Sequence, residues 1–80
     1  MAVLRLFAQA REAAGATQDV VDGDTVDAVL TAARARYGDE FAKLLPTCKV
    51  WVNGEPASGD AVVGDDDEVA ILPPVSGGAG

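Results

Sequence analysis

The feature that most constrains this sequence is one long amphipathic segment, residues 24–37, bounded on both sides by turn signals. Asp22-Gly23 precedes it and Gly38 follows it, and such residues are typical of helix boundaries. Either Asp24 or Thr25 suits the position that caps a helix. The apolar residues recur at helical spacing and form one stripe, made of Val26, Val29, Leu30, Ala33 and Tyr37. A chain of this size must bury that stripe against a second layer of structure.

The segments around the helix have the patterns of strands. In the first, Leu4 and Leu6 share one face, which we assign to the core, while Phe7 falls on the other face near the surface. Asn53-Gly54 is a preferred turn of a tight hairpin. We therefore expect strands at Ala2–Ala8, Thr17–Val21, Cys48–Val52, around Pro56–Ser58, and at Glu68–Leu72.

Two shorter segments favour single helical turns. One covers Arg11–Ala14 and ends at Gly15. The other covers Asp39–Leu45, would turn Phe41 and Leu44 inward, and is limited by Pro46. The resulting order predicts an α+β domain, with one main helix packed across one face of a mixed sheet of four to five strands. This is the pattern of a ubiquitin-like β-grasp, although the pattern alone also allows other small split α/β folds. Core residues from the later strands would be Val50, Val52, Val69 and Ile71.

Charge and composition exclude several classes of function. The net charge is −7, from 13 acids and 6 bases, which argues against nucleic acid or an anionic membrane as a partner. The only cysteine is Cys48 and there is no histidine, so we expect no internal disulfide, no bound metal and no Ser–His–Asp or Cys–His active site. No apolar run approaches a membrane span and no signal peptide precedes the first strand, so a cytoplasmic protein is expected.

The chain ends in VAILPPVSGGAG, a strand that leads into two prolines and then into very small residues. We divide the sequence into a globular domain, 1–72, and an extended flexible tail, 73–80. Pro73-Pro74 favours a stiff, extended spacer of about 3 Å per residue. Gly77 and Gly78 have no Cβ, so they fit a narrow channel and leave a carboxyl carbon open to attack. The alternative interpretation is that SGGAG is simply a disordered end.

Three stretches together point to a known family. The opening LRLFAQAREAAG, the hairpin VNGEPA and the ending DDDEVAILPPVSGG resemble the small subunit of molybdopterin synthase, the MoaD family of ubiquitin-like sulfur carriers. The resemblance implies that an activating enzyme uses ATP to adenylate the terminal glycine and that sulfur then replaces AMP. The thiocarboxylate so formed would donate sulfur to a pterin precursor, which builds the dithiolene that binds molybdenum.

The same resemblance assigns partners and site residues. It implies a heterotetramer of two carriers and two large synthase subunits, an adenylating enzyme and a sulfur donor system, with no cofactor and no independent active site on this chain. Phe7 and Leu72 match positions that dock on partners. Residues of the tail would enter partner active sites, namely Pro73, Pro74, Val75, Ser76 and Gly77.

The sequence departs from the family at its end, because the family usually stops at the residue that corresponds to Gly78. Here Ala79 and Gly80 follow, and two residues extend the reach by about 7 Å. Either a protease removes Ala79-Gly80 and Gly78 carries the sulfur, or Gly80 itself is activated, or the extension is inactivating or foreign to the natural chain. The rival functions are a carrier for thiazole or cysteine synthesis, a protein modifier, and a passive ubiquitin-like binding domain.

Other residues leave their roles open. Arg11 and Glu12 match an RE pair of the family and either pair locally or touch a partner. Cys48 is read as a half-buried small residue, or else as a relay thiol that would need a lowered pKa. Trp51 faces away from the core strand residues and suits either an interface or a satellite core. The acid run Asp65–Glu68 is interpreted as a solvated turn, because consecutive acids converge poorly on a metal ion.

Overall fold

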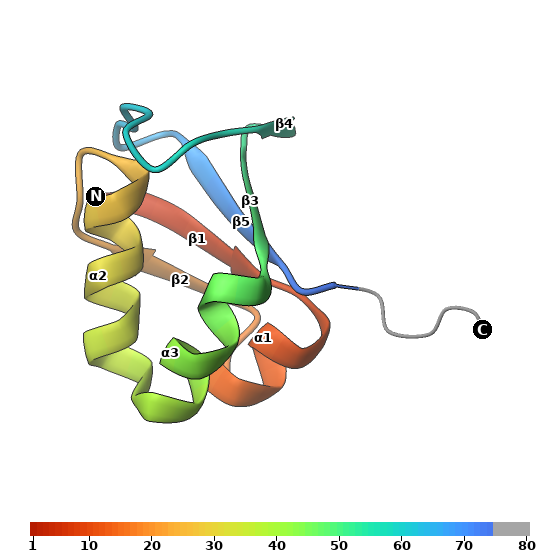
Figure 1. Cartoon of the computed structure of the whole chain (residues 1–80). Helices are drawn as coiled ribbons and strands as arrows, with labels where there is room; N and C mark the ends of the chain where they lie inside the picture. Colours follow the sequence, from red (N-terminus) through yellow and green to blue (C-terminus); the bar gives the residue numbers. More distant parts are fainter. Residues whose placement is uncertain (75–80) are drawn as a thin grey trace.

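The computed structural model describes residues 1–74, which form a five-stranded sheet with α2 packed across one face (Figure 1). The strand order is β2-β1-β5-β3-β4; β1 and β5 run parallel, and the other neighbours are antiparallel. This arrangement confirms the predicted α+β architecture. No helix in the described part of the chain is long and apolar enough to cross a membrane. The elements are β1 (Ala2–Leu6), α1 (Ala8–Ala14), β2 (Gln18–Val21), α2 (Val26–Tyr37), α3 (Asp39–Leu44), the 3₁₀ turn η1 (Leu45–Thr47), β3 (Lys49–Val52), β4 (Glu55–Pro56) and β5 (Glu68–Leu72).

The core lies between α2 and the two central strands, β1 and β5. Leu4 and Val69 are paired in the parallel ladder, and both are fully buried. Val50 and Val52 of β3 are only half-buried at the margin of this layer. Buried residues that were predicted for the core are Leu4, Leu6, Val26, Val29, Ala33, Phe41, Val69 and Ile71; buried residues that were not are Ala2, Ala10, Val21, Leu45 and Val63.

The start of α2 is held by the loop that precedes β5. Thr25 caps the helix, and its hydroxyl oxygen accepts a 3.2 Å hydrogen bond from the Ala28 N–H. The next free N–H groups bond to the loop, because Val26 donates to the Ala61 carbonyl at 2.9 Å and Asp27 donates to the Gly59 carbonyl at 2.8 Å. A helix normally leaves these donors unpaired. The loop therefore fixes the position of α2 over the sheet.

The first strand is shorter than predicted and the first helix is longer. We expected a strand to Ala8 and a helical turn from Arg11, but β1 ends at Leu6 and α1 begins at Ala8. Ala8 has φ of 49°, a left-handed conformation that turns the chain sharply out of the sheet. Gly15 ends α1 in the left-handed conformation, as predicted. The early turn moves Ala10 into the core, where it is fully buried.

The hairpin after β3 confirms its turn but not its second strand. Asn53 and Gly54 have φ of 51° and 85°, the two positive values that a type I′ turn requires. The following strand was predicted at Pro56–Ser58, whereas β4 covers only Glu55–Pro56. After β4, one further backbone hydrogen bond joins this segment to β3, from the Ala57 N–H to the Val50 carbonyl at 3.1 Å. The chain then leaves the sheet to form the loop that holds α2.

Candidate functional site

The candidate site lies where the parallel strands β1 and β5 both end. Leu6 is paired with Ile71, so the next residues, Phe7 just after β1 and Leu72 at the end of β5, lie at the same end of the sheet. Side chains alternate between the faces of a strand, and Leu6 and Ile71 point into the core. Phe7 and Leu72 therefore lie on the face away from α2. The fold brings together the two residues that were predicted to dock on partners, from opposite ends of the sequence.

Phe7 is held in an exposed position by its neighbours. Its backbone is extended and it occupies the cap position of α1, with 40% of the residue exposed. The Arg5 guanidinium lies 5.8 Å from the centre of the Phe7 ring, within cation–π range. Arg5 also pairs with Glu68 of β5 at 3.3 Å. These contacts give an apolar ring a defined place on an open surface, as the predicted docking role would require.

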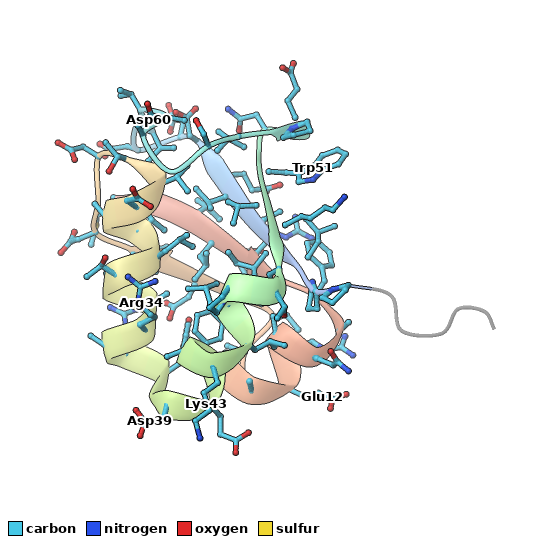
Figure 2. All side chains as sticks on the ribbon, in the orientation of Figure 1. Glu12, Arg34, Asp39, Lys43, Trp51 and Asp60 are labelled. Atoms are coloured by element: carbon cyan, nitrogen blue, oxygen red, sulfur yellow. The ribbon has the colours of Figure 1, made fainter. Side chains whose placement is uncertain are left out.

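A groove of about 410 Å³ lies at the root of the tail. Leu72 is paired with Lys49 across the β3–β5 ladder, and Trp51 is the next residue of β3 on the same face. Trp51 is half-buried, and Figure 2 shows it on the side of the molecule where the chain leaves the sheet. The groove is lined by Thr47, Lys49, Trp51, Leu72, Pro73 and Pro74.

This groove bears on one open interpretation and adds residues that sequence reasoning missed. Trp51 lines a groove at the tail, which favours the interface alternative for this residue. Thr47 and Lys49 were not predicted at the site. The alternation of β3 places Lys49 on the same face as Trp51, so that signal was available once the strand was assigned.

The tail itself is described only at its start. Pro73 is half-buried and Pro74 is exposed, directly after β5 ends at Leu72. The remaining predicted tail residues lie outside the described part of the chain, so their roles stay predictions: Val75, Ser76, Gly77, Gly78, Ala79 and Gly80.

Cys48 has the environment of a structural thiol. Its Sγ donates a 3.4 Å hydrogen bond to the Leu44 carbonyl, and the residue is half-buried. Burial raises the pKa of the Cys48 thiol, which is the opposite of what a relay thiol needs. Cys48 also lines a second groove, of about 440 Å³, between β3 and the start of α2, which shares Lys49 and Trp51 with the groove at the tail.

The acid run at the start of β5 forms separate local contacts. Asp65 accepts a 2.7 Å bond from the amino terminus, and this lowers the pKa of Asp65. Asp67 accepts bonds from the Asn53 side chain at 2.9 Å and from the Gly64 N–H at 2.8 Å, which lower the pKa of Asp67. Within residues 1–74 no three Cys, His, Asp or Glu side chains are grouped closely enough to hold a metal ion.

Arg11 and Glu12 both lie exposed on α1. They are consecutive residues of the helix, so their side chains do not face each other. Local pairing, one of the two alternatives for this RE pair, is therefore absent here. Contact with a partner stays a prediction.

Comparisons with known proteins identify the family. The ThiS family matches residues 4–78. SAMP1 from Haloferax volcanii is 34% identical, with a TM-score of 0.75, covering 95% of this chain and 97% of that one. CysO, solved in the BexX/CysO complex of Amycolatopsis orientalis, is 24% identical, with a TM-score of 0.81 and coverage of 96% and 99%. A putative molybdopterin converting factor subunit 1 from Pyrococcus furiosus is also 24% identical, with a TM-score of 0.78 and coverage of 92% and 97%.

The matched range includes both the strands and most of the tail, ending at Gly78. The solved structures share the fold over almost their whole lengths, which confirms the ubiquitin-like β-grasp. The names of these proteins give them different roles. The comparisons therefore identify a family but no single sulfur pathway. The chain therefore belongs to the ThiS family of ubiquitin-like sulfur carriers and modifiers.

Proposed function

We propose that this chain carries sulfur as a thiocarboxylate on its C-terminal glycine, Gly78 in a form that ends there. The observation that supports this most is the geometry at the end of β5. The central strand ends at Leu72 and continues directly into Pro73-Pro74, beside the exposed Phe7 and the groove. The family match that extends to Gly78 supports that residue over Gly80.

The chemistry requires activation by a partner. A carboxylate is a poor electrophile, so an adenylating enzyme would transfer AMP from ATP to the carboxylate and release pyrophosphate. A sulfur donor would then attack the carbonyl carbon, and AMP would leave with the electrons of the C–O bond. This chain supplies the reacting carboxyl carbon on a glycine, which has no Cβ to obstruct the attack. It also supplies a stiff proline spacer that positions this glycine. ATP would bind to the partner and not to this chain.

Among the sulfur pathways we propose molybdopterin synthesis, with this chain as the small subunit of the synthase. The proposal is based on the LFAQ-RE opening and the PPV spacer, which resemble that branch of the family. Two copies would join two large subunits, and the thiocarboxylate would reach the pterin precursor in each. A processing protease that removes Ala79-Gly80 would precede activation.

The groove and Phe7 would form the docking surface for these partners. Phe7, Leu72 and Trp51 place apolar area around the root of the tail, and aromatic side chains often contribute most to binding energy. Docking there would hold the tail close to the partner's active site, so that the reacting carboxyl acts at high effective concentration.

A second candidate is a protein modifier. The comparison that favours it is SAMP1 of Haloferax volcanii, a small archaeal modifier protein, at 34% identity. In that case an activated C-terminal carboxyl would form an amide with a lysine of a target. Both candidates need the same activation step. They differ in whether sulfur or an amine attacks the activated carboxyl.

Mass spectrometry tests the proposal. Forms that end at Gly78 and at Gly80 are incubated with the activating enzyme, ATP and a sulfide donor. A gain of about 16 Da marks the exchange of oxygen for sulfur. We expect it on the Gly78 form, and a Gly78→Ala variant of that form is the matched control. Absence of the gain on both forms contradicts the carrier function.

A second stage separates the pathways. The large subunit and the pterin precursor are added to the thiocarboxylate form, and dithiolene formation supports the molybdopterin role. If the gain occurs without dithiolene formation, the carrier serves another pathway. Detection in cells of this chain attached to lysines of other proteins would favour the protein-modifier function.

A further inference from the structure

The outer edge of β2 has an unusual arrangement of hydrogen bonds. β2 is an edge strand, paired only with β1. Val20 is opposite Val3, whose N–H donates in the other direction, to the Asp67 carbonyl at 3.0 Å. Residues of an antiparallel pair alternate between bonding each other and pointing outward. The N–H and C=O groups of Val20 therefore face away from β1, where a further strand would bind.

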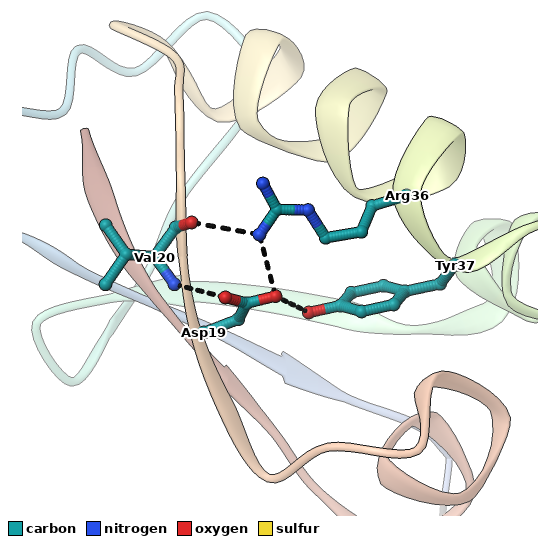
Figure 3. A network of polar contacts seen from close by, with 4 residues as sticks. All are labelled: Asp19, Val20, Arg36 and Tyr37. Atoms are coloured by element: carbon teal, nitrogen blue, oxygen red, sulfur yellow. Dashed lines mark hydrogen bonds and ion pairs between the residues drawn. The ribbon is translucent and has the colours of Figure 1, made fainter.

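Both of these backbone groups are bound by side chains. The Val20 N–H donates to Asp19 Oδ1 at 2.8 Å, and the Val20 carbonyl accepts a 3.1 Å bond from Arg36 Nη1. The same Arg36 nitrogen bonds to Asp19 Oδ2 at 2.8 Å, so one ion pair covers the donor and the acceptor together (Figure 3). Asp19 comes from β2 and Arg36 comes from α2 (Figure 3).

Tyr37 fixes the ion pair in place. Its hydroxyl donates to Asp19 Oδ2 at 2.6 Å, and its ring packs edge-on against the fully buried Phe41 with 5.1 Å between ring centres. The bonds from Tyr37, Arg36 and the Val20 N–H lower the pKa of Asp19 to about 2. The carboxylate is therefore charged at every pH near neutrality, and the cover stays formed.

The other edge of the sheet is protected in a different way. β4 has only two residues, and one of them, Pro56, has no N–H to donate. β2 is longer and presents Val20, which is 45% exposed. An apolar edge strand with free backbone groups is a template for pairing with another chain. β2 is thus the edge that needs protection.

We propose that the Asp19–Arg36 pair, positioned by Tyr37, covers the outward-facing backbone groups of Val20 and so hinders a second copy of this chain from adding its own β2 at this edge. A second copy is the partner that this edge fits best. Two β2 strands related by a two-fold axis run antiparallel and offer each other the same alternation of donors and acceptors. This proposal is independent of the sulfur-carrier function.

The test opens the edge without changing the net charge. The double variant Asp19→Ala/Arg36→Ala removes one acid and one base, so 12 acids and 5 bases again give −7. Sedimentation velocity from micromolar to millimolar concentration measures self-association, and amide exchange by NMR measures protection of the Val20 N–H. We expect self-association at least about tenfold tighter than in the wild-type chain, roughly the effect of one net backbone hydrogen bond. The Val20 amide should exchange faster in dilute solution and become protected in the dimer.

Tyr37→Phe is the intermediate variant. It removes the bond that positions Asp19 but keeps both members of the ion pair over Val20, so we expect self-association clearly weaker than that of the double variant. The proposal is wrong if the double variant stays monomeric, if its dimer leaves the Val20 amide unprotected, or if Tyr37→Phe associates equally. Should the double variant fail to fold, Arg36→Ala alone opens the Val20 carbonyl, and a monomer at all concentrations then also refutes the proposal.

Discussion

Gly23 lies so close to the first turn of α2 that a methyl group added to it would come within 2.7 Å of the Val29 backbone nitrogen. Gly23 also has φ of 151°, a conformation that other residues rarely adopt. The turn between β2 and α2 therefore depends on glycine for two separate reasons, conformation and space.

We predict that Gly23→Ala lowers the free energy of unfolding by about 2–4 kcal/mol, because both strain and a backbone clash must be relieved. Urea denaturation followed by circular dichroism measures the change. Gly15→Ala is the control, since Gly15 has φ of 75° but nothing within 4 Å of an added Cβ. Its cost should be only about 1 kcal/mol. Equal losses in the two variants would contradict the role of close packing at Gly23.

Thr25→Ala should destabilise the protein by about 1 kcal/mol, the usual cost of removing a helix cap. The hydroxyl oxygen that accepts from the Ala28 N–H would be lost, while the backbone bridge between Thr25 and Val62 would remain. The midpoint of thermal unfolding reports the loss. Thr25→Ser keeps the oxygen and should recover most of the stability; if it is as unstable as alanine, the hydrogen bond is not the cause.

The ionisation of the Tyr37 phenol can be measured without interference from other tyrosines, because Tyr37 is the only tyrosine in the chain. It therefore reports on the cluster that Tyr37 forms with Asp19 and Arg36 at β2. Burial of the ring and then the bond to Asp19 raise the pKa of Tyr37 to about 12. A raised pKa means that the native contacts favour the neutral phenol. Their contribution to stability is complete below the ordinary value near 10 and is lost as the pH rises toward 12.

We therefore expect ultraviolet absorbance to show phenol ionisation near pH 12 in the folded protein and near pH 10 in denaturant. In Asp19→Asn the ionisation should shift to lower pH, since the neighbouring negative charge is gone. An unchanged titration in that variant would mean that the Asp19 carboxylate does not act on the phenol.

The groove at the tail predicts a defined effect on partner binding. Trp51→Ala should weaken binding to the activating enzyme by about tenfold or more, as is usual for a central aromatic residue of an interface. Calorimetry measures the affinity. Val62→Ala is the matched control, because Val62 is an exposed apolar residue, 78% accessible, in a loop outside the groove. Equal effects of both changes would exclude the groove as the docking surface.

Much of the fold was predictable because its signals are local. The stripe of α2 and its boundaries, the Asn53-Gly54 turn and the limits of β5 all follow from short-range patterns, and all are confirmed. The sharp exit at Ala8 was not predicted, because alanine gives no signal for a positive φ. The loop that caps α2 was also missed, since its bonds join residues that are far apart in sequence.

The candidate site was likewise predictable from the sequence only in part. Alternation along β1 correctly placed Phe7 on the outer face, and the same alternation along the observed β5 places Leu72 there. The groove between β3 and the tail could not be predicted, because it depends on the order of the strands across the sheet. Only the adjacency of β3 and β5 brings Lys49 and Trp51 beside Pro73.

The position of β5 at the centre of the sheet has a mechanical consequence. A partner that grips the tail and pulls it along the strand direction would load the hydrogen bonds to β1 and β3 in shear, many at once, instead of opening them one by one. An outer strand pulled in the same direction would share the load with one neighbouring strand only. The C-terminal end of the chain is therefore anchored through two strand ladders at once.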